Sequence, residues 1–458
     1  MKWIPKFRFS LRTLLVVTTL LGVVLIPLAV RLEQARQQKE AVAWVLEHGG
    51  TVYYGGAEES NNFTVEPESS SYFSKYPSYQ SKTRTASWLE DYFGTDFVYS
   101  VVGVELPYSK PWKLPGINLN KDNDELDISP LAGLHQLERF RFSWPSDVDL
   151  SPLSQITTLR EIDLSDSGIT SLAPLANLSN LESIKIDKSG ITDISPISNL
   201  TQITELNLSS TKIDTLEAIA NFKLLKSINL SFSKVTDLAP LSQLDNLEAV
   251  NLSFTRVQDL TPLSELKQLK SLRFELTEVS DISALEHLTN LRSVEFSHTQ
   301  VSDVSPLANH TKIQSLTFDS TAITDISALG QLHNLSELSF SDTKISDITS
   351  LATCKELSQM DFTNTPVTDL TPLAQLEKLM VIDHRMIDRS SINWSNSPIK
   401  WSDLSSRLKY PTVIGYNPSI KTHLLLTNST VSIDEVADLK ARFPKWKIIL
   451  WNPNSAVQ

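Results

Sequence analysis

Leucine and isoleucine recur at a fixed spacing of 22 residues through the middle of the chain. The series continues without insertion or deletion over twelve positions: Leu131, Leu153, Leu175, Ile197, Ile219, Leu241, Leu263, Leu285, Leu307, Leu329, Leu351 and Leu373. Each unit has the pattern L-x-x-L-x-x-L-x-x-L-x-L-x-x-[S/T]-x-[I/V]-x-D-[I/L]-x-P. A fixed period of this length indicates a solenoid in which every repeat is one structural unit.

Within each repeat, apolar and polar residues alternate over a short segment such as Val250-Asn251-Leu252. This alternation predicts a strand whose apolar side chains point inward. One strand cannot bury its inner face alone, so the stacked repeats are expected to share a continuous core. A proline after Ser, Thr or Ala fits the first position of a short helical turn. It stands at Pro130, Pro152, Pro174, Pro196, Pro240, Pro262, Pro306 and Pro372.

The pattern therefore predicts an α/β repeat solenoid of about twelve repeats over residues 125–385. We expect a curved array with a parallel sheet on its concave side. Short helical turns or irregular segments should form the convex side, because only about seven residues are available for each turn.

The repeat resembles the leucine-rich repeat family, in particular its 22-residue, internalin-like bacterial class, whose phrase DISPLAxL occurs here as DISPLAGL at 127–134. The resemblance covers about residues 125–385. The flanks are similar to membrane-anchored bacterial repeat proteins that begin FSLRTLL (9–15) and continue into HGGTVYY (48–54). This resemblance implies a non-catalytic recognition module of the cell envelope whose partner is a protein.

Two polar columns of the repeat have both a structural and a ligand-binding interpretation. A hydroxyl follows each strand, from Ser167 to Thr365, where the family usually has Asn; it can serve the turn backbone or form a threonine array for a ligand. An aspartate recurs in the next turn, as in Asp127 and Asp303. It can cap that turn or build a calcium ladder. We favour the structural interpretation of both columns.

His310 and Cys354 occupy an inward column that is otherwise leucine, as in Leu244 and Leu288. They are predicted to be core variants rather than a base and a nucleophile. Cys354 is the single cysteine of the chain, so no intramolecular disulfide can form.

The N-terminus has the features of a membrane anchor. Residues 13–30 are 18 uncharged residues, close to the length that spans a bilayer. Four basic residues precede this run and three follow it, which favours a cytoplasmic N-terminus. We expect a cytoplasmic tail over 1–12, a single-pass transmembrane helix over 13–31 and a repeat domain in the periplasm or at the cell surface. A cleaved signal peptide is the alternative.

Both ends of the array are expected to be capped. Residues 32–124 should form an N-terminal capping region with a helix over 31–50, a strand at 51–54, a polar loop at 57–86 and a second helix and strand within 87–106. Residues 386–458 should form the C-terminal capping region, in which Ser432 and Glu435 compose a capping box before a helix and a final strand. The stretch 386–430 has no repeat periodicity.

Charge and motifs narrow the function. The net charge is −12, and residues 1–40 are basic, so the remaining chain is acidic. Because a nucleic-acid backbone needs a basic patch, we expect no nucleic-acid partner. Phosphate-binding loops, HExxH, GxSxG and Cys-x-x-Cys pairs are absent from the sequence. We therefore predict no enzyme activity, no cofactor and no metal.

The outward positions of the strands vary between repeats, and they indicate the candidate site. Three successive repeats place Asn207, Asn229 and Asn251 on the exposed strand face, followed by Arg273. Next to this strip, one column holds the apolar residues Phe232, Phe254 and Leu276 in consecutive repeats. The column begins with Trp144, and its remaining members up to Asn364 are polar. Exposed aromatics beside polar groups are typical of a binding hot spot. The two phenylalanines can alternatively fold over the rim and shield the edge of the ladder.

These seven residues, Asn207, Asn229, Asn251, Phe232, Phe254, Leu276 and Arg273, form the predicted ligand-binding site on the concave face. The family resemblance favours a protein partner, and the neutral Asn strip with aromatics also fits a glycan. The alternative function is a structural envelope or cell-surface scaffold without a specific ligand.

Overall fold

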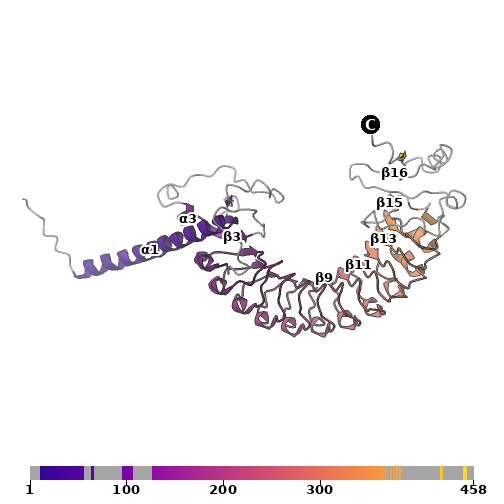
Figure 1. Ribbon diagram of the computed structural model, residues 1–458, viewed down its shortest axis with the longest axis horizontal. Coiled ribbons are helices and arrows are strands. Elements are labelled where there is room, and N and C mark those ends of the chain that lie inside the picture. The colour runs from indigo at the N-terminus through magenta and orange to yellow at the C-terminus, as the bar shows by residue number, and fades with distance from the viewer. Residues whose placement is uncertain are drawn as a thin grey trace, which may run out of the picture. The chain divides into compact units, whose positions relative to one another are not determined.

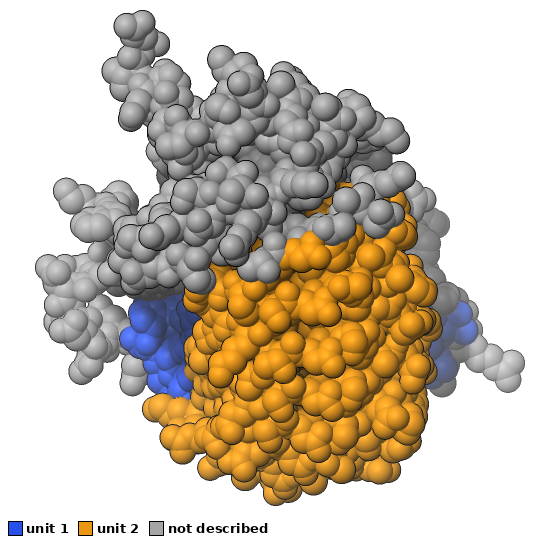
Figure 2. Space-filling view, turned by 90° about the vertical axis from the view of Figure 1, so that its right-hand side faces the viewer, with its two compact units in different colours: residues 1–203 blue, residues 204–458 orange. Residues whose placement is uncertain are grey.

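The computed structural model describes residues 11–55, 63–65, 95–106 and 126–367, scattered positions from 369 to 382, and the segments 423–426 and 447–450. Figure 1 shows its helices and strands in chain order. The chain divides into two compact units, residues 1–203 and 204–458, which are blue and orange in Figure 2.

Unit 1 begins with the helix α1 (Leu11–Glu47) and continues into the strands β1 (Thr51–Gly55) and β2 (Phe63–Val65), the short helix α3 (Thr95–Val98) and the strand β3 (Ser100–Leu106). β1 pairs antiparallel with both β2 and β3, and β3 pairs in parallel with the first repeat strand. The predicted helix over 31–50 is confirmed up to Glu47, where α1 ends, and the strand at 51–54 is confirmed as β1. The prediction of a loop throughout 57–86 is wrong at β2. Of the segment predicted as a second helix and strand, the described residues form α3 and β3, and residues 87–94 lie outside the described part.

A buried glutamine connects the elements of this N-terminal region. Gln38 on α1 donates from Nε2 to the carbonyl of Tyr99 at 2.8 Å and to Oδ1 of Asp96 at 3.0 Å. Its Oε1 accepts the backbone N–H of Val101 on β3 at 3.0 Å. Tyr54 on β1 also donates to Asp96, at 2.7 Å. Because one side chain satisfies groups on several elements, α1 has a fixed position on the sheet within unit 1.

The predicted anchor, residues 13–31, lies in α1. Its apolar side chains between Leu15 and Val30 are largely exposed where the structure describes them; residues 1–10 and the side chains of 11–14, 17 and 20 lie outside the described part. Among the residues described, no helix combines the length and the apolar character needed to cross a membrane.

The repeats alternate a strand with a 3₁₀ turn, as predicted. In unit 1 the strands are β4 (Arg139–Phe142), β5 (Glu161–Asp163) and β6 (Ser183–Lys185), and the turns are η2 (Ser129–Gly133), η3 (Ser151–Gln155), η4 (Ala173–Leu175) and η5 (Ser195–Ile197). β3 to β6 are parallel, with each residue of one repeat strand opposite the residue 22 positions later. Strands and turns line opposite sides (Figure 1).

Unit 2 continues the same alternation. Its strands are β7 (Glu205–Asn207), β8 (Ser227–Asn229), β9 (Ala249–Asn251), β10 (Ser271–Arg273), β11 (Ser293–Glu295), β12 (Ser315–Thr317), β13 (Glu337–Ser339), β14 (Gln359–Asp361) and β15 (Val381–Ile382). Its turns are η6 (Glu217–Ile219), η7 (Ala239–Leu241), η8 (Thr261–Leu263), η9 (Ser283–Leu285), η10 (Ser305–Leu307), η11 (Ser327–Gln331) and η12 (Thr349–Thr353). Neighbouring strands pair in parallel and in register throughout.

The predicted final strand is β17 (Lys447–Leu450), which pairs in parallel with β16 (His423–Leu426). The capping box at Ser432 and the stretch 386–430, apart from β16, lie outside the described residues.

An internal column of phenylalanines distinguishes the second half of unit 2. The inward residue after each strand is leucine at 208, 230 and 252 and phenylalanine from Phe274 to Phe362. Successive rings of Phe274, Phe296, Phe318, Phe340 and Phe362 are stacked, with centroids 5.3–6.1 Å apart. We call these five residues the phenylalanine spine. The repeat pattern predicted an apolar core here, but not this stack.

Both polar columns have the predicted structural role. The hydroxyl of Thr255 donates to the carbonyl of Leu252 at 2.6 Å, and the same bond recurs at Thr211, Thr277, Thr299, Thr321, Thr343 and Thr365. Oδ1 of Asp303 accepts the backbone N–H of Ser305 at 2.7 Å, which together with the Ser305 hydroxyl lowers the pKa of that carboxyl. The described residues contain no cluster of three or more His, Cys, Asp or Glu able to hold a metal.

His310 and Cys354 are core residues, as predicted. Nε2 of His310 lies 2.9 Å from the carbonyl of Leu285 and therefore donates to it, while Nδ1 has no partner among the described residues. Cys354 makes the equivalent contact to the carbonyl of Leu329 at 3.4 Å, and burial raises the pKa of its thiol to about 11. The thiol is thus protonated and enclosed at neutral pH.

Replacing His310 with leucine is expected to remove part of the acid sensitivity of the fold. Burial lowers the pKa of His310 in the folded protein. Below about pH 6.5 this histidine is therefore protonated in the unfolded chain while it stays neutral in the folded chain. The free energy of unfolding then falls with decreasing pH by up to about 1.4 kcal/mol per pH unit. Leucine fits the column, and the carbonyl of Leu285 keeps its bond from Leu288.

Urea unfolding of both proteins between pH 7.5 and 5.0 measures this effect. The carboxylates titrate equally in the two chains, so only the difference between the curves reports His310. If the free energy of unfolding changed equally with pH in the two proteins, the prediction would be wrong. His310 would then have the same pKa in the folded and the unfolded chain.

Candidate functional site

The candidate site lies on the outward side of the strands and the turn that follows each of them, which we call the strand face. Each repeat contributes two strand positions and two turn positions, for example Ser227 and Asn229 in β8 and Ser231 and Phe232 in the turn that follows. The core occupies the opposite side of each strand, because side chains alternate along it. The two units differ in how these outward groups are used.

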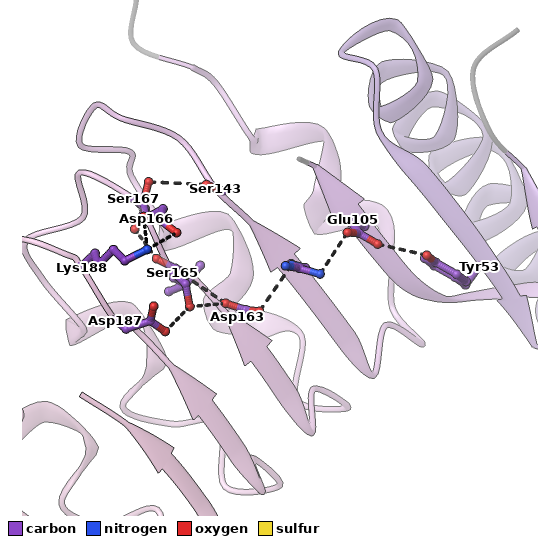
Figure 3. Close-up of polar contacts among 11 residues, drawn as sticks. Tyr53, Glu105, Ser143, Asp163, Ser165, Asp166, Ser167, Asp187 and Lys188 are labelled. Carbon is purple, nitrogen blue, oxygen red and sulfur yellow. Dashed lines mark hydrogen bonds and ion pairs between the residues drawn. The ribbon is translucent and has the colours of Figure 1, made fainter. Parts of the chain in front are cut away.

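On the strand face of unit 1, polar side chains bind one another (Figure 3). Tyr53 donates to Glu105 at 3.1 Å. Arg141 then bridges Glu105 at 3.2 Å and Asp163 at 3.4 Å. The ion pairs extend from the N-terminal cap into the first repeats.

The network continues along the next strands of unit 1 (Figure 3). The hydroxyl of Ser165 lies 2.6 Å from a carboxylate oxygen of both Asp163 and Asp187. In the turn column, Lys188 pairs with Asp166 at 3.1 Å. These charged groups are largely neutralised within the chain, which makes the strand face of unit 1 a poor candidate for a partner.

In unit 2 the side-chain oxygen of each of the three predicted asparagines accepts a backbone N–H two residues further on. Oδ1 of Asn229 accepts the backbone N–H of Ser231 at 3.1 Å, and Oδ1 of Asn251 accepts that of Ser253 at 3.0 Å. Asn207 makes the same bond to Ser209. An N–H needs an oxygen acceptor, so these bonds fix the orientation of each amide. Nδ2 of Asn229 and Asn251 has no partner among the described residues and can donate to a ligand.

Beside the asparagines, the structure brings together the three predicted apolar residues. Phe232, Phe254 and Leu276 are 54%, 43% and 44% exposed. The two phenylalanine rings are stacked at a centroid distance of 4.0 Å and an interplanar angle of 14°. We call these three residues the apolar step. Stacking already orders the two rings in the free protein. Binding of a partner therefore costs less side-chain conformational entropy.

The turn column that holds the apolar step has a left-handed backbone. Its φ values are 58° at Phe232, 59° at Phe254 and 51° at Leu276, and they are similar at all ten described non-glycine residues of the column from Asp166 to Asn364. Asparagine and aspartate tolerate this conformation, whereas bulky side chains do not. Asp166, Asp342 and Asn364 in this column are the sequence signal for a left-handed backbone. The conformation was not among the predictions made from the sequence.

The backbone geometry also weakens the edge-shield interpretation. The N–H of Phe254 donates to the carbonyl of Glu275 at 2.8 Å. The same ladder bond forms at Ser210 and Asp342, where the side chain is polar. The ladder therefore does not need an aromatic cover.

Arg273, the seventh predicted residue, is engaged within the chain. Its guanidinium pairs with Glu295 at 3.2 Å. Burial and then the charge of Glu295 raise the pKa of the neighbouring Glu275. Arg273 therefore belongs to a charged cluster rather than to the neutral Asn strip.

Further along the strand face, carboxylates are fixed by hydroxyl and backbone donors. Oδ1 of Asp319 accepts the hydroxyl of Ser339 at 2.6 Å and the N–H of Ser341 at 2.7 Å. The hydroxyl of Ser341 donates to Oδ1 of Asp361 at 2.7 Å. Burial raises the pKa of Asp319, and the charges of Asp361 and Asp342 add to this. The strand face thus passes from neutral to acidic along unit 2.

Comparison with known proteins supports the fold. No protein-family model and no curated protein sequence matches the chain. Among solved structures, the internalin InlF of Listeria monocytogenes is 29% identical, with a TM-score of 0.54 over 57% of this chain and 78% of its own. A leucine-rich repeat protein of Leptospira interrogans is 19% identical, with a TM-score of 0.52 over 72% of this chain and 82% of its own.

Proposed function

The chain is a leucine-rich repeat protein, and we propose that it binds a protein partner, without catalysis, on the strand face of unit 2. The observation that carries this proposal is the apolar step. Three exposed apolar residues stand next to outward amide donors in a column whose backbone disfavours them. The strand face of unit 1, whose charged groups pair with one another, offers no comparable patch.

A protein partner agrees with the chemistry of the step better than a glycan does. One face of each phenylalanine ring covers the other ring, and Leu276 adds an aliphatic surface. Apolar side chains of a polypeptide can pack on such a surface, while its backbone carbonyls accept from Asn229 and Asn251. The proposed site also includes Asn207 and Arg273, the other two residues predicted from the sequence.

The test compares the full chain with the variant Phe232→Asn/Phe254→Asn in affinity capture from the envelope fraction, followed by mass spectrometry. Leu224→Ser is the matched control, because Leu224 is 43% exposed but lies in the turn leading into β8, off the strand face. We expect a partner that the wild type and the control capture and the double variant loses. Capture of nothing, or equal capture by all three, would favour a scaffold without a specific ligand.

We also propose, from the sequence, that residues 13–31 anchor the protein in a membrane with the repeats outside the cytoplasm. The 18 uncharged residues and their basic flank support this proposal. Cysteine labelling in spheroplasts tests it, because the natural Cys354 is buried and its raised thiol pKa keeps it unreactive. An impermeant maleimide should label Ser280→Cys and not Ser10→Cys. The reverse pattern would contradict the orientation, and extraction of the protein by alkaline carbonate would contradict the anchor.

A further inference from the structure

The charge of the strand face narrows the class of partner. From β10 to β14, the outward positions hold six carboxylates and a single Arg or Lys, Arg273. The carboxylates, which we call the acidic run, belong to Glu275, Glu295, Asp319, Glu337, Asp342 and Asp361. Because Arg273 already pairs with Glu295, the run keeps a large negative charge.

The acidic run is continuous with the apolar step. The backbone N–H of Phe254 donates to the carbonyl of Glu275, and the hydroxyl of Ser253 lies 3.5 Å from Oε2 of Glu275. Glu275 is also one residue before Leu276, the last member of the step. One ligand that covers the step therefore also meets the first carboxylates of the run.

The carboxylates are pre-organised for a ligand. The hydrogen bonds to Asp319 and Asp361 engage Oδ1, and Oδ2 of each has no partner among the described residues. Burial raises the pKa values of Glu275 and Asp319, and repulsion from neighbouring carboxylates raises them further. A cation placed between them would relieve this repulsion. The described residues contain no cluster of three or more His, Cys, Asp or Glu suited to a metal ion. The lysine and arginine side chains of a polypeptide can supply the cation.

We propose that the strand face of unit 2 binds a basic polypeptide segment, with an apolar side chain on the step of Phe232, Phe254 and Leu276 and lysine or arginine side chains along the acidic run. This inference rests on the proposed function and adds the chemistry of the partner. The six strand spacings from β8 to β14 span about 29 Å. An extended segment of about nine residues covers this length.

Selection of random twelve-residue peptides on the full chain in detergent tests the inference. We expect enriched peptides with an apolar residue followed by at least two lysines or arginines. A representative peptide should then bind Glu275→Gln/Asp319→Asn at least ten times more weakly than the wild type. The matched control Glu265→Gln/Glu286→Gln removes two exposed charges outside the strand face and should change affinity less than twofold.

The inference is wrong if the selection enriches acidic or uncharged peptides, or none. It is also wrong if the representative peptide binds Glu275→Gln/Asp319→Asn as tightly as the wild type, or if a lysine peptide without the apolar residue binds as tightly as the representative peptide. The same peptide selection is repeated on Phe232→Asn/Phe254→Asn. It distinguishes a wrong partner chemistry from a wrong binding site. Uncharged peptides that are lost on that variant leave the site intact and refute only the basic partner. Peptides that bind that variant as tightly as the wild type refute the site itself.

Discussion

Replacing Phe318 with alanine is expected to lower the free energy of unfolding by about 3–5 kcal/mol. The ring is completely buried and stacks on Phe296 at 5.6 Å and on Phe340 at 6.1 Å. Alanine would leave a cavity between two rings that the flanking repeats hold at a fixed spacing, so the neighbours have little freedom to close it. Each repeat depends on its neighbours for burial, and the loss therefore affects the cooperative unfolding of the array.

Phe318→Leu is the control for this prediction. Leucine stands in the same inward column at 208, 230 and 252 and keeps most of the apolar volume. It should cost less than about 1.5 kcal/mol. Denaturant unfolding of the three proteins, followed by circular dichroism, gives both values. If alanine were no more costly than leucine, the spine would be loosely packed and would not stabilise the second half of unit 2.

The fold was predictable because a strict 22-residue period allows few solutions for burying Leu and Ile in every repeat. The capping role of Asp303 and the buried hydrogen bond of Thr255 also followed from the pattern. A polar side chain that recurs in nearly every repeat is expected to bind the backbone of the turn, because this backbone is the same in every repeat. The phenylalanine spine did not follow. Leucine and phenylalanine are both apolar, and the pattern does not record which ring lies against which. β2 was missed because its segment is polar and Ser-rich.

The candidate site was predictable in part. Outward positions vary between repeats, so the repeat pattern was enough to identify Asn251 and Phe254 as exposed neighbours. The stacking of Phe254 on Phe232, the fixed amides and the ion pair of Arg273 emerge only in the folded chain. Stacking depends on side-chain torsions and the ion pair on reach across strands, and neither follows from residue order alone. The left-handed column could have been found from its Asp and Asn members.

The double variant Phe232→Asn/Phe254→Asn is expected to lose binding of the proposed partner by about 30-fold or more while keeping its stability within about 1 kcal/mol of the wild type. Aromatic hot-spot residues each contribute about 2 kcal/mol or more to binding, and the two rings act as one surface. Two opposing effects determine the stability. The variant loses the partial burial and stacking of the rings, about 0.5–1.5 kcal/mol for the pair beyond area burial. It gains relief of the left-handed strain, about 1–2 kcal/mol for each L-residue and less for asparagine.

Asparagine is the informative substitution because Asn364 already occupies this column with a φ of 56°. Thermal unfolding and binding of the captured partner are measured on the same preparations. Loss of binding at unchanged stability identifies the apolar step as a recognition surface, for which the chain tolerates backbone strain. A large fall in the unfolding temperature, with no partner for any form, would instead show that the rings shield the edge of the ladder. The step would then be a stabilising device, and the scaffold function would account for the chain.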